Sequence, residues 1–289
     1  MKKVKYSLLS IAAISLLLTG CNSSSGGGKK HPSQSSDTSE GPTTTGSDPT
    51  TEPGPSSTSE SPSPYIPEGY YDECEGLSGN ALEAKLKAIN PAKAPNYSWS
   101  RFEAEDEALD DPNSILSLYT RHNIGKKNHC GDYSWDTWNR EHIWTQTAFP
   151  ASDEDNHNIF ACEGQINQVR SNYKFDEGGS PVSVHGHETG CKYKTGTSFE
   201  PCDEAKGEVA RAVMYGAVMY GYTMTQEIQS FELALKWHLQ HPNTTRDTIR
   251  NQRVYLLQGN RNPFVDHPEY ACRIWGEKNS ATKSLCGIN

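Results

Sequence analysis

Residues 138–144 read WNREHIW and place a carboxylate beside an imidazole within a run of bulky apolar side chains. The tryptophans and the isoleucine of this run favour an extended strand. Neighbouring side chains on a strand point to opposite faces of it. Glu141 and His142 can therefore serve one site only if the strand ends or bends where they stand.

A second polar segment, DNHNIFACEGQINQVRSN, follows at residues 155–172. Its second half predicts a short helix. On such a helix Asn167 and Arg170 lie on one side, because residues three apart are neighbours on the helix surface. The two segments together bring amide, guanidinium, carboxylate and imidazole groups into one short stretch of chain.

Three longer helices are predicted outside these segments, over residues 80–90, 203–222 and 226–239. Each carries apolar residues at helical spacing, and the first begins with the capping-box pattern of Asn80 and Glu83. The chain between the first two is rich in Gly, Asn and Asp and contains short apolar runs, which suit short strands and long loops. The sequence therefore predicts an α+β fold.

The N-terminus predicts export. Residues 1–20 combine three lysines with an apolar run that is shorter than the roughly 20 residues a membrane-spanning helix needs. The run ends in LTGC, which looks like a lipoprotein cleavage motif, so Cys21 is the expected lipidation site. An ordinary cleaved signal followed by an incidental cysteine is the alternative. Asn22 after the cysteine predicts sorting to the outer membrane, on either its periplasmic or its cell-surface side.

A change in composition predicts the domain boundary. From residue 22 to residue 64 the chain has no aromatic or large aliphatic side chain, so residues 21–64 are expected to form a disordered tether. All the tryptophans and tyrosines but one lie from Tyr65 onward. Residues 65–289 are long enough for one sizeable core and are predicted to form a single domain.

The charge balance is unusual for a protein that binds nucleic acids. The formal net charge is −9, and it falls entirely within the folded part because the N-terminal charges cancel. Nucleic-acid binders are often basic, since contacts to phosphate supply most of their nonspecific affinity. A local basic cleft can still exist on an acidic domain. Arginines cluster in the C-terminal third, at positions 246, 250, 253, 261 and 273.

Seven cysteines follow Cys21, and disulfides are expected outside the cytoplasm. Many pairings are open. Cys191–Cys202 and Cys272–Cys286 are expected because each closes a short local loop. A structural zinc site is the competing interpretation, although the chain has no Cys-x-x-Cys pair.

Four stretches resemble one known family, the endonuclease I enzymes of the ββα-metal superfamily. NREHIW resembles their histidine-bearing strand, and DNHNIFACEGQINQVRSNYKF resembles their second strand and helix. FEPCDEAKGEVARAVMYGAVMY and RNQRVYLLQGNRNPFVDHPE resemble two later motifs of the family, in the same order. The resemblance runs from about Tyr70 to Trp275. It implies a ββα-metal core embedded in a mixed, helix-rich domain.

The resemblance also implies roles for single residues. His142 matches the general base, and Glu141 and Asn167 match the two protein ligands of a magnesium ion, for which Mn²⁺ or Ca²⁺ can substitute. The implied reaction is hydrolysis of DNA to leave 5′-phosphate ends, and the choice between DNA alone and DNA together with RNA stays open. Broad specificity is expected because contacts to phosphate and sugar carry little sequence information.

The chain departs from the family between the two polar segments. Bacterial periplasmic members carry a cysteine-rich loop there, with an arginine that steadies the phosphate, whereas residues 145–154 contain no arginine. Arg140, Arg170 and Arg261 are the candidates for that role. Arg170 also belongs, with Asn172, to the family's Arg-Ser-Asn triplet. Both are expected to contact the substrate or to support the site.

Two other functions are compatible with the sequence, a catalytically silent lipoprotein that binds extracellular DNA and a lipoprotein of the cell envelope. The intact Glu141, His142 and Asn167 set argues against both. His157 is interpreted as a packed histidine that supports the site, and His185 and His187 as exposed loop residues. No protein partner is implied, and a monomer is expected.

Overall fold

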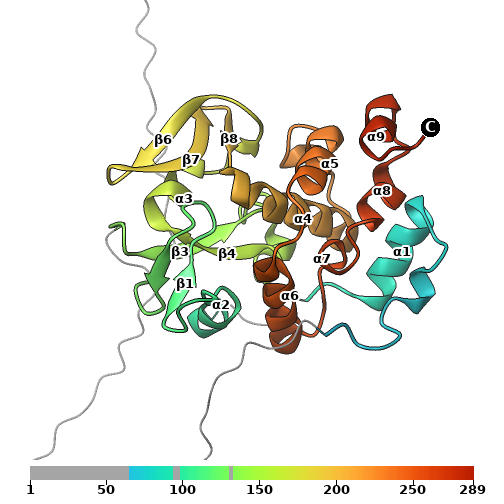
Figure 1. Cartoon of the computed structure of the whole chain (residues 1–289), viewed down its shortest axis with the longest axis horizontal. Coiled ribbons are helices and arrows are strands. Elements are labelled where there is room, and N and C mark those ends of the chain that lie inside the picture. Colours follow the sequence, from blue (N-terminus) through green and yellow to red (C-terminus); the bar gives the residue numbers. More distant parts are fainter. Residues whose placement is uncertain (1–64, 94–97, 130–132) are drawn as a thin grey trace, which may run out of the picture. The chain divides into compact units, whose positions relative to one another are not determined.

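The computed structural model describes residues 65–289, apart from residues 94–97 and 130–132. The predicted signal peptide, the lipidation site at Cys21 and the tether up to residue 64 lie outside the described residues. So does Cys130. The described part combines many helices with short strands (Figure 1), which confirms the predicted α+β class. Within it, no helix is both long and apolar enough to cross a membrane.

A two-stranded antiparallel sheet followed by a helix carries the two polar segments. Strand β3 (Trp138–His142) pairs with β4 (Ile159–Glu163), with Glu141 opposite Phe160 and His142 opposite Ile159. Helix α3 (Gly164–Arg170) begins directly after β4. The carboxylate of Glu163 caps it by accepting hydrogen bonds from the first backbone N–H groups. The predicted ββα core is confirmed.

Two further sheets flank this core. Strands β1 (Ser114–Leu116) and β2 (Asn123–Gly125) form a hairpin. The other sheet has the order β5-β8-β7-β6. Its strands are β5 (Lys174–Phe175), β6 (Ser180–Val184), β7 (His187–Lys194) and β8 (Ser198–Glu200). This sheet lies next to α3 in Figure 1, so α3 has the ββα strands on one side and the β6–β7 hairpin on the other.

The predicted helices are present, with one change of bounds. The structure has α1 (Gly79–Ile89), α4 (Asp203–Tyr220) and α5 (Phe231–Gln240). Helix α5 begins later than predicted, because Met224–Gln226 form a separate 3₁₀ turn (η3) and Ser230 caps α5. Helix α4 ends where Gly221 adopts the left-handed conformation that glycine favours.

Helix α4 lies at the centre of the core and fixes the segment that follows β3. The indole Nε1 of Trp144 donates to the carbonyl oxygen of Ala212 at 3.2 Å. A Cβ atom on Gly216 would lie 2.1 Å from that indole nitrogen, so only glycine lets the tryptophan approach the helix this closely. The packing of Trp144 on α4 thereby sets the direction in which the chain leaves β3.

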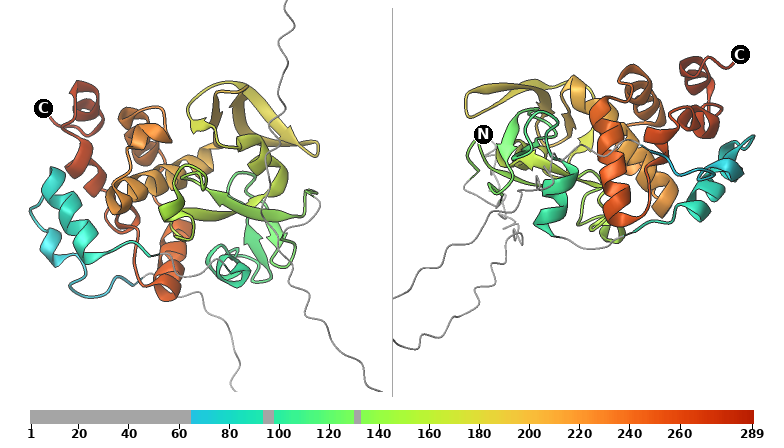
Figure 2. Two further views of the ribbon diagram at one scale, coloured as in Figure 1. Left: turned by 180° about the vertical axis from the view of Figure 1, so that it is seen from behind. Right: turned by 60° about the horizontal axis from the view of Figure 1, so that its bottom comes forward.

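Helix α6 (Thr245–Gln258) was not predicted from the sequence. Its buried residues are mostly polar and include three arginines, with Val254 as the one buried apolar residue. Arg246 and Arg250 are buried and both contact the carboxylate of Asp106. The C-terminal arginine cluster is therefore largely internal. Figure 2 shows α6 in orange-red beside the teal α2, against which it packs.

The remaining helical segments are short. They are η1 (Asp72–Cys74), α2 (Trp99–Glu105), η2 (Pro150–Ser152), α7 (Pro263–Asp266), α8 (Tyr270–Trp275) and α9 (Ser280–Leu285). None was predicted, because a helix of one or two turns shows too few periods of an apolar pattern to stand out from a loop.

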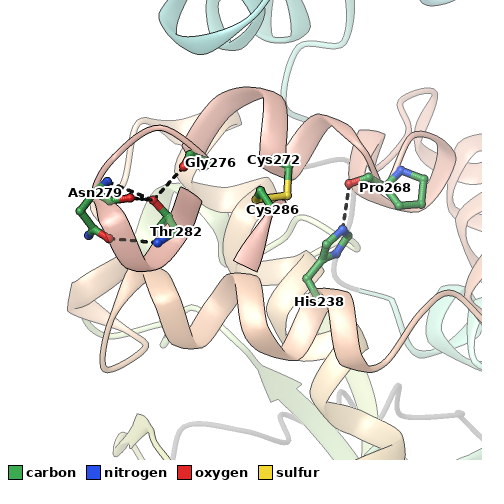
Figure 3. Close-up of a disulfide and its surroundings, with 7 residues drawn as sticks. All are labelled: His238, Pro268, Cys272, Gly276, Asn279, Thr282 and Cys286. Carbon is green, nitrogen blue, oxygen red and sulfur yellow. Dashed lines mark hydrogen bonds between the residues drawn. A yellow bond between two sulfur atoms is a disulfide. The ribbon is translucent and has the colours of Figure 1, made fainter. Parts of the chain in front are cut away.

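One of the two expected disulfides is present. Cys272 and Cys286 are joined by a bond of 2.02 Å, which links α8 to the end of α9 (Figure 3). The expected Cys191–Cys202 bridge is absent, and both residues are free, buried thiols. Cys191 lies on β7, where its thiol contacts the backbone oxygen of Tyr119. A short loop between two cysteines is therefore not sufficient evidence for a disulfide bond.

Candidate active site

The two faces of β3 divide the predicted site residues. Asn139 and Glu141 share one face, while Arg140 and His142 share the other, because side chains alternate along a strand. The strand ends at His142. This ending meets the condition under which Glu141 and His142 can both serve one site.

Glu141 is buried, with its carboxylate held on the inner face of β3. Its Oε1 accepts a hydrogen bond from the Tyr119 hydroxyl at 2.7 Å and lies 3.2 Å from Nε of Arg170. Burial raises the pKa of Glu141, and the charge of Arg170 opposes that effect. A carboxylate has about four lone-pair positions, so these contacts leave capacity for a cation.

Arg170 holds Glu141 in place and cannot contact substrate. Its side chain is 1% exposed, and its guanidinium also donates to the carboxylate of Glu227 and to the backbone oxygen of Ile143. Of the two roles predicted for Arg170, the contact with substrate is therefore wrong, and support of the site is what the structure favours. Glu227 comes from a distant part of the chain, and no sequence pattern indicated this pairing.

Asn167 projects from α3 toward β3. Its amide nitrogen donates to Oδ1 of Asn139 at 2.7 Å and to the backbone oxygen of Arg140 at 3.2 Å. Both bonds use the nitrogen, so the orientation of the amide is fixed. The amide oxygen is the remaining polar atom of this partly exposed side chain. It belongs to the same layer of side chains as Glu141.

The donor set of Glu141 and Asn167 fits a magnesium ion. Mg²⁺ prefers hard oxygen ligands and keeps several of its waters, so one carboxylate and one amide oxygen are enough from the protein. Residues 65–289, outside the two gaps, contain no group of three or more His, Cys, Asp or Glu side chains placed to hold a metal. A carboxylate with an amide is not such a group. Asn167 reaches β3 through Asn139 and the backbone of Arg140, the two residues that precede Glu141.

His142 is oriented by the loop that follows η2. Its Nε2 lies 3.1 Å from the backbone oxygen of Asp153, which can only accept a hydrogen bond. In the neutral ring Nε2 therefore carries the proton, and Nδ1 is the basic nitrogen. Burial lowers the pKa of His142 to about 4, so the ring is neutral at pH 7. The contact uses the backbone of Asp153, so no sequence motif indicated it.

Arg140 is the partly exposed arginine beside His142. Its guanidinium lies 3.9 Å above the Trp99 ring, and the His129 ring stacks on Trp99 with centroids 4.3 Å apart. Both contacts are face-on, so Trp99 is sandwiched between the guanidinium and the imidazole. The charge of Arg140 contributes to the lowered pKa of His142, after the larger effect of burial. Neither Trp99 nor His129 was predicted to contribute to the site.

Arg261 is not available to the site. It is 1% exposed and forms an ion pair with Asp266 at 2.6 Å. Among Arg140, Arg170 and Arg261, only Arg140 therefore combines partial exposure with a position next to His142. Asn172 is exposed in the turn after α3.

The other histidines have structural surroundings. His157 is buried, and its Nε2 lies 3.1 Å from the backbone oxygen of Asn260. Burial lowers its pKa to about 3. His187 stacks on the Trp135 ring, and His185 lies 3.5 Å from a carboxylate oxygen of Glu163.

Comparisons with known proteins agree with this geometry. The sequence model of the family described as Endonuclease I matches residues 78–269, which include every residue of the site. An extracellular ribonuclease of Bacillus amyloliquefaciens is 35% identical over 235 residues, which cover 72% of this chain and 78% of that protein. A similar protein from Bacillus subtilis is 32% identical over 71% of this chain and 78% of its own length, and is also called an extracellular ribonuclease. A periplasmic deoxyribonuclease of Aeromonas hydrophila is 31% identical over 46% of this chain and 55% of its own length.

Proposed function

Because this chain belongs to the endonuclease I family, we propose that it is an exported, magnesium-dependent endonuclease that hydrolyses the phosphodiester bonds of DNA and RNA. The relatives are extracellular or periplasmic nucleases. They support the broader conclusion that this chain is an exported nuclease. One observation carries the finer proposal. Glu141 and His142 are the last two residues of β3, and the side chain of Asn167 reaches the backbone of the same strand at Arg140.

Glu141 and Asn167 are the proposed metal ligands. Magnesium bound there supplies a positive charge that polarises the scissile phosphate and stabilises the charge developing on it. Mn²⁺ or Ca²⁺ is expected to bind the same oxygens. Arg170 and Tyr119 keep the Glu141 carboxylate oriented toward the site, since both contact its Oε1.

His142 is the proposed general base. Its Nε2–H donates to the backbone oxygen of Asp153, which directs Nδ1 away from that backbone. Nδ1 accepts the proton of the attacking water as the water oxygen bonds to phosphorus. The bond from phosphorus to the 3′-oxygen breaks on the opposite side, so the product carries a 5′-phosphate.

Arg140 is proposed to hold a phosphate oxygen of the substrate. It lies on the same face of β3 as His142, and its guanidinium carbon lies 3.9 Å from the centre of the Trp99 ring. A planar guanidinium binds phosphate through two parallel N–H groups. Asn172, exposed at the end of α3, is proposed to contact the same strand.

RNA and DNA are both expected substrates. Contacts to the backbone carry little sequence information, so cleavage is expected to be broadly nonspecific. The two relatives that match more than two thirds of the chain are named ribonucleases, whereas the deoxyribonucleases match less than half of it. This difference in coverage supports RNA as a full substrate beside DNA.

We also propose that a lipid on Cys21 anchors the enzyme in the outer membrane and that the catalytic domain acts as a monomer. Labelling with a radioactive fatty acid, compared between the natural chain and Cys21→Ser, tests the anchor. The label is expected in the natural chain alone. Label in both chains, or in neither, would contradict the proposal.

Digestion of supercoiled plasmid and of single-stranded RNA by the purified full-length protein tests the activity. Both substrates are expected to be cut in magnesium and to stay intact in EDTA, with 5′-phosphate ends on the products. Cutting in EDTA would contradict the metal dependence. Binding of DNA with no cutting in magnesium would favour the alternative function, a catalytically silent DNA-binding lipoprotein.

A further inference from the structure

An open groove of about 490 Å³ is lined by residues of α3, of the segment that follows it and of strands β6 and β7. Gln168 and Ser171 form part of its α3 wall. Tyr173, after the helix, and Tyr193, on β7, add two aromatic rings. None of the residues assigned above to the metal or to proton transfer lines it.

The chemistry of the groove is neutral and rich in hydroxyl groups. Among the described residues, those that line it include no Asp, Glu, Lys or Arg. The whole chain carries a net charge of −9, so the acidic parts of its surface would repel a nucleic-acid strand. A wall without carboxylates offers a path along which a polyanion meets no direct charge repulsion.

The two tyrosine rings are held in fixed positions. Their centroids are 5.5 Å apart, with an angle of 48° between the ring planes. The Tyr193 hydroxyl accepts a hydrogen bond from the backbone N–H of Gly196, and its ring packs partly against the core. The backbone of Tyr193 is pressed against Gly179, where a Cβ atom would lie 2.6 Å from the Tyr193 carbonyl carbon. Both rings remain partly exposed.

The groove begins beside the proposed metal site. Gln168 follows Asn167 directly in α3, so the α-carbons of a lining residue and of a metal ligand are only about 3.8 Å apart. Their side chains point about 100° apart around the helix, so the two residues occupy adjacent faces of α3. We expect a strand whose phosphate lies at Asn167 to place a neighbouring nucleotide at the groove.

We propose that this groove binds a nucleobase of the substrate strand, stacked on Tyr173 and Tyr193, next to the phosphodiester that is cut. The inference rests on the proposed nuclease function and adds a base subsite to it. Stacking on an aromatic ring tolerates any sequence, because every base has a π face. The subsite gives affinity without base readout and favours unpaired strands, since a base in the groove must leave its duplex.

The test measures binding and cleavage separately with the full-length protein. A fluorescent single-stranded DNA of twelve nucleotides is titrated in EDTA, and KM and kcat for its cleavage are measured in magnesium. Tyr173→Ala and Tyr193→Ala are expected to raise both Kd and KM about tenfold, with kcat changed less than twofold. Tyr173→Phe and Tyr193→Phe keep the rings and are expected to behave as the natural protein.

Two substitutions of opposite charge at one exposed residue of the groove give a second test, which leaves both aromatic rings in place. Thr195→Glu is expected to raise Kd for the same DNA, and Thr195→Lys is expected to lower it. Thermal unfolding checks that each variant folds. Tyr173 and Thr195 keep the proposal testable even if Tyr193→Ala fails to fold.

The outcomes separate this inference from the proposed function. Unchanged Kd and KM in Tyr173→Ala and in both Thr195 variants would overturn the base subsite while leaving the nuclease in place. Equal weakening in the Ala and Phe variants of Tyr173 would overturn it too. If the natural protein binds DNA through the tyrosines but cuts nothing in magnesium, the nuclease proposal fails and the groove stands.

Discussion

Arg140 on β3 and Arg250 on α6 have nearly the same immediate packing and different surroundings. Each guanidinium carbon lies over an aromatic ring, 3.9 Å from the Trp99 ring centre for Arg140 and 3.8 Å from the Phe160 ring centre for Arg250. Arg250 is buried and donates to the carboxylate of Asp106 at 2.7 Å. Arg140 is partly exposed beside His142. Burial makes one arginine part of the fold, while partial exposure next to the proposed base makes the other a candidate for binding phosphate.

The difference explains how an acidic protein can act on a polyanion. The arginines of α6 contribute little to the surface, because Arg246, Arg250 and Arg253 all pair with buried or half-buried carboxylates. A count of arginines therefore overstates the positive charge that a substrate meets. Arg170 and Arg261 are 1% exposed, whereas Arg140 is partly exposed, so we expect the Arg140 guanidinium to provide positive charge beside the proposed site.

Removing Arg250 should have the largest effect, and that effect should be on stability. Arg250→Ala leaves Asp106 buried with one partner fewer and also deprives the backbone oxygen of Ile159, at the start of β4, of a donor. Breaking a buried ion pair from one side costs about 3–5 kcal/mol. Denaturant unfolding measures the loss. Lys236→Ala is the matched control, since Lys236 pairs with Glu177 at the surface and should contribute less than about 1 kcal/mol.

Cleavage by folded Arg250→Ala should stay within about tenfold of the natural rate. A loss of 10²-fold or more per folded molecule would break the comparison, because it would make an α6 arginine catalytic.

Removing Arg140 should have the opposite effect, a large loss of activity with a small change in stability. Arg140→Ala is expected to lower kcat/KM by about 10²–10³-fold, the usual cost of losing one donor to a developing charge. Its unfolding free energy should change less than that of Arg250→Ala, because Arg140 is only partly buried. Arg140→Lys should restore only part of the rate, since an ammonium cannot bind phosphate through a planar fork. An unchanged rate in Arg140→Ala would contradict the assignment.

The charge network of α6 should also set the acid sensitivity of the fold. Burial raises the pKa of Glu208, but the charges of Arg121 and Arg246 outweigh it and lower that pKa to about 2. A carboxyl with a lowered pKa contributes stability above its unfolded value of 4.5, and this stability is lost as the pH falls toward 2. The loss is at most about 3 kcal/mol.

Glu208→Gln tests this pH dependence. Unfolding of the natural protein and of the variant should be compared between pH 5 and pH 2.5. The variant is expected to be less stable at pH 5 and to show a shallower decline, because it has no carboxyl to protonate at this position. Parallel pH profiles would mean that Glu208 does not carry the effect.

The smallest expected effect concerns the ring under Arg140. Trp99→Leu removes the face on which the guanidinium lies and should raise KM roughly three- to tenfold, with kcat much less affected. Trp99→Phe keeps an aromatic face and should restore most of the affinity. In the Arg140→Ala background Trp99→Leu should have no further effect on KM. Additive effects in the double variant would show that Trp99 acts independently of Arg140.

How far the sequence predicts this molecule depends on where the partners of each residue lie along the chain. Helix α4 was predictable because the apolar residues at helical spacing in its sequence are the residues that the helix buries. Helix α6 was not, because its inward face is polar and the carboxylates that neutralise it come from other elements. The same holds for Arg170, whose partner Glu227 is 57 residues away. The motif of Glu141, His142 and Asn167 was identified by resemblance, while the Trp99 and Asp153 contacts that orient the site required the three-dimensional arrangement.

The most direct test of the catalytic assignment is cleavage of supercoiled plasmid in magnesium by full-length His142→Ala, measured beside the natural protein. The natural protein should cut, and the variant should be slower by at least 10²-fold, the usual contribution of a positioned general base. Both proteins should unfold at similar temperatures, so that the loss reflects chemistry. Undiminished cutting by a folded, pure His142→Ala protein would contradict the assignment of the general base and, with it, the site at the end of β3.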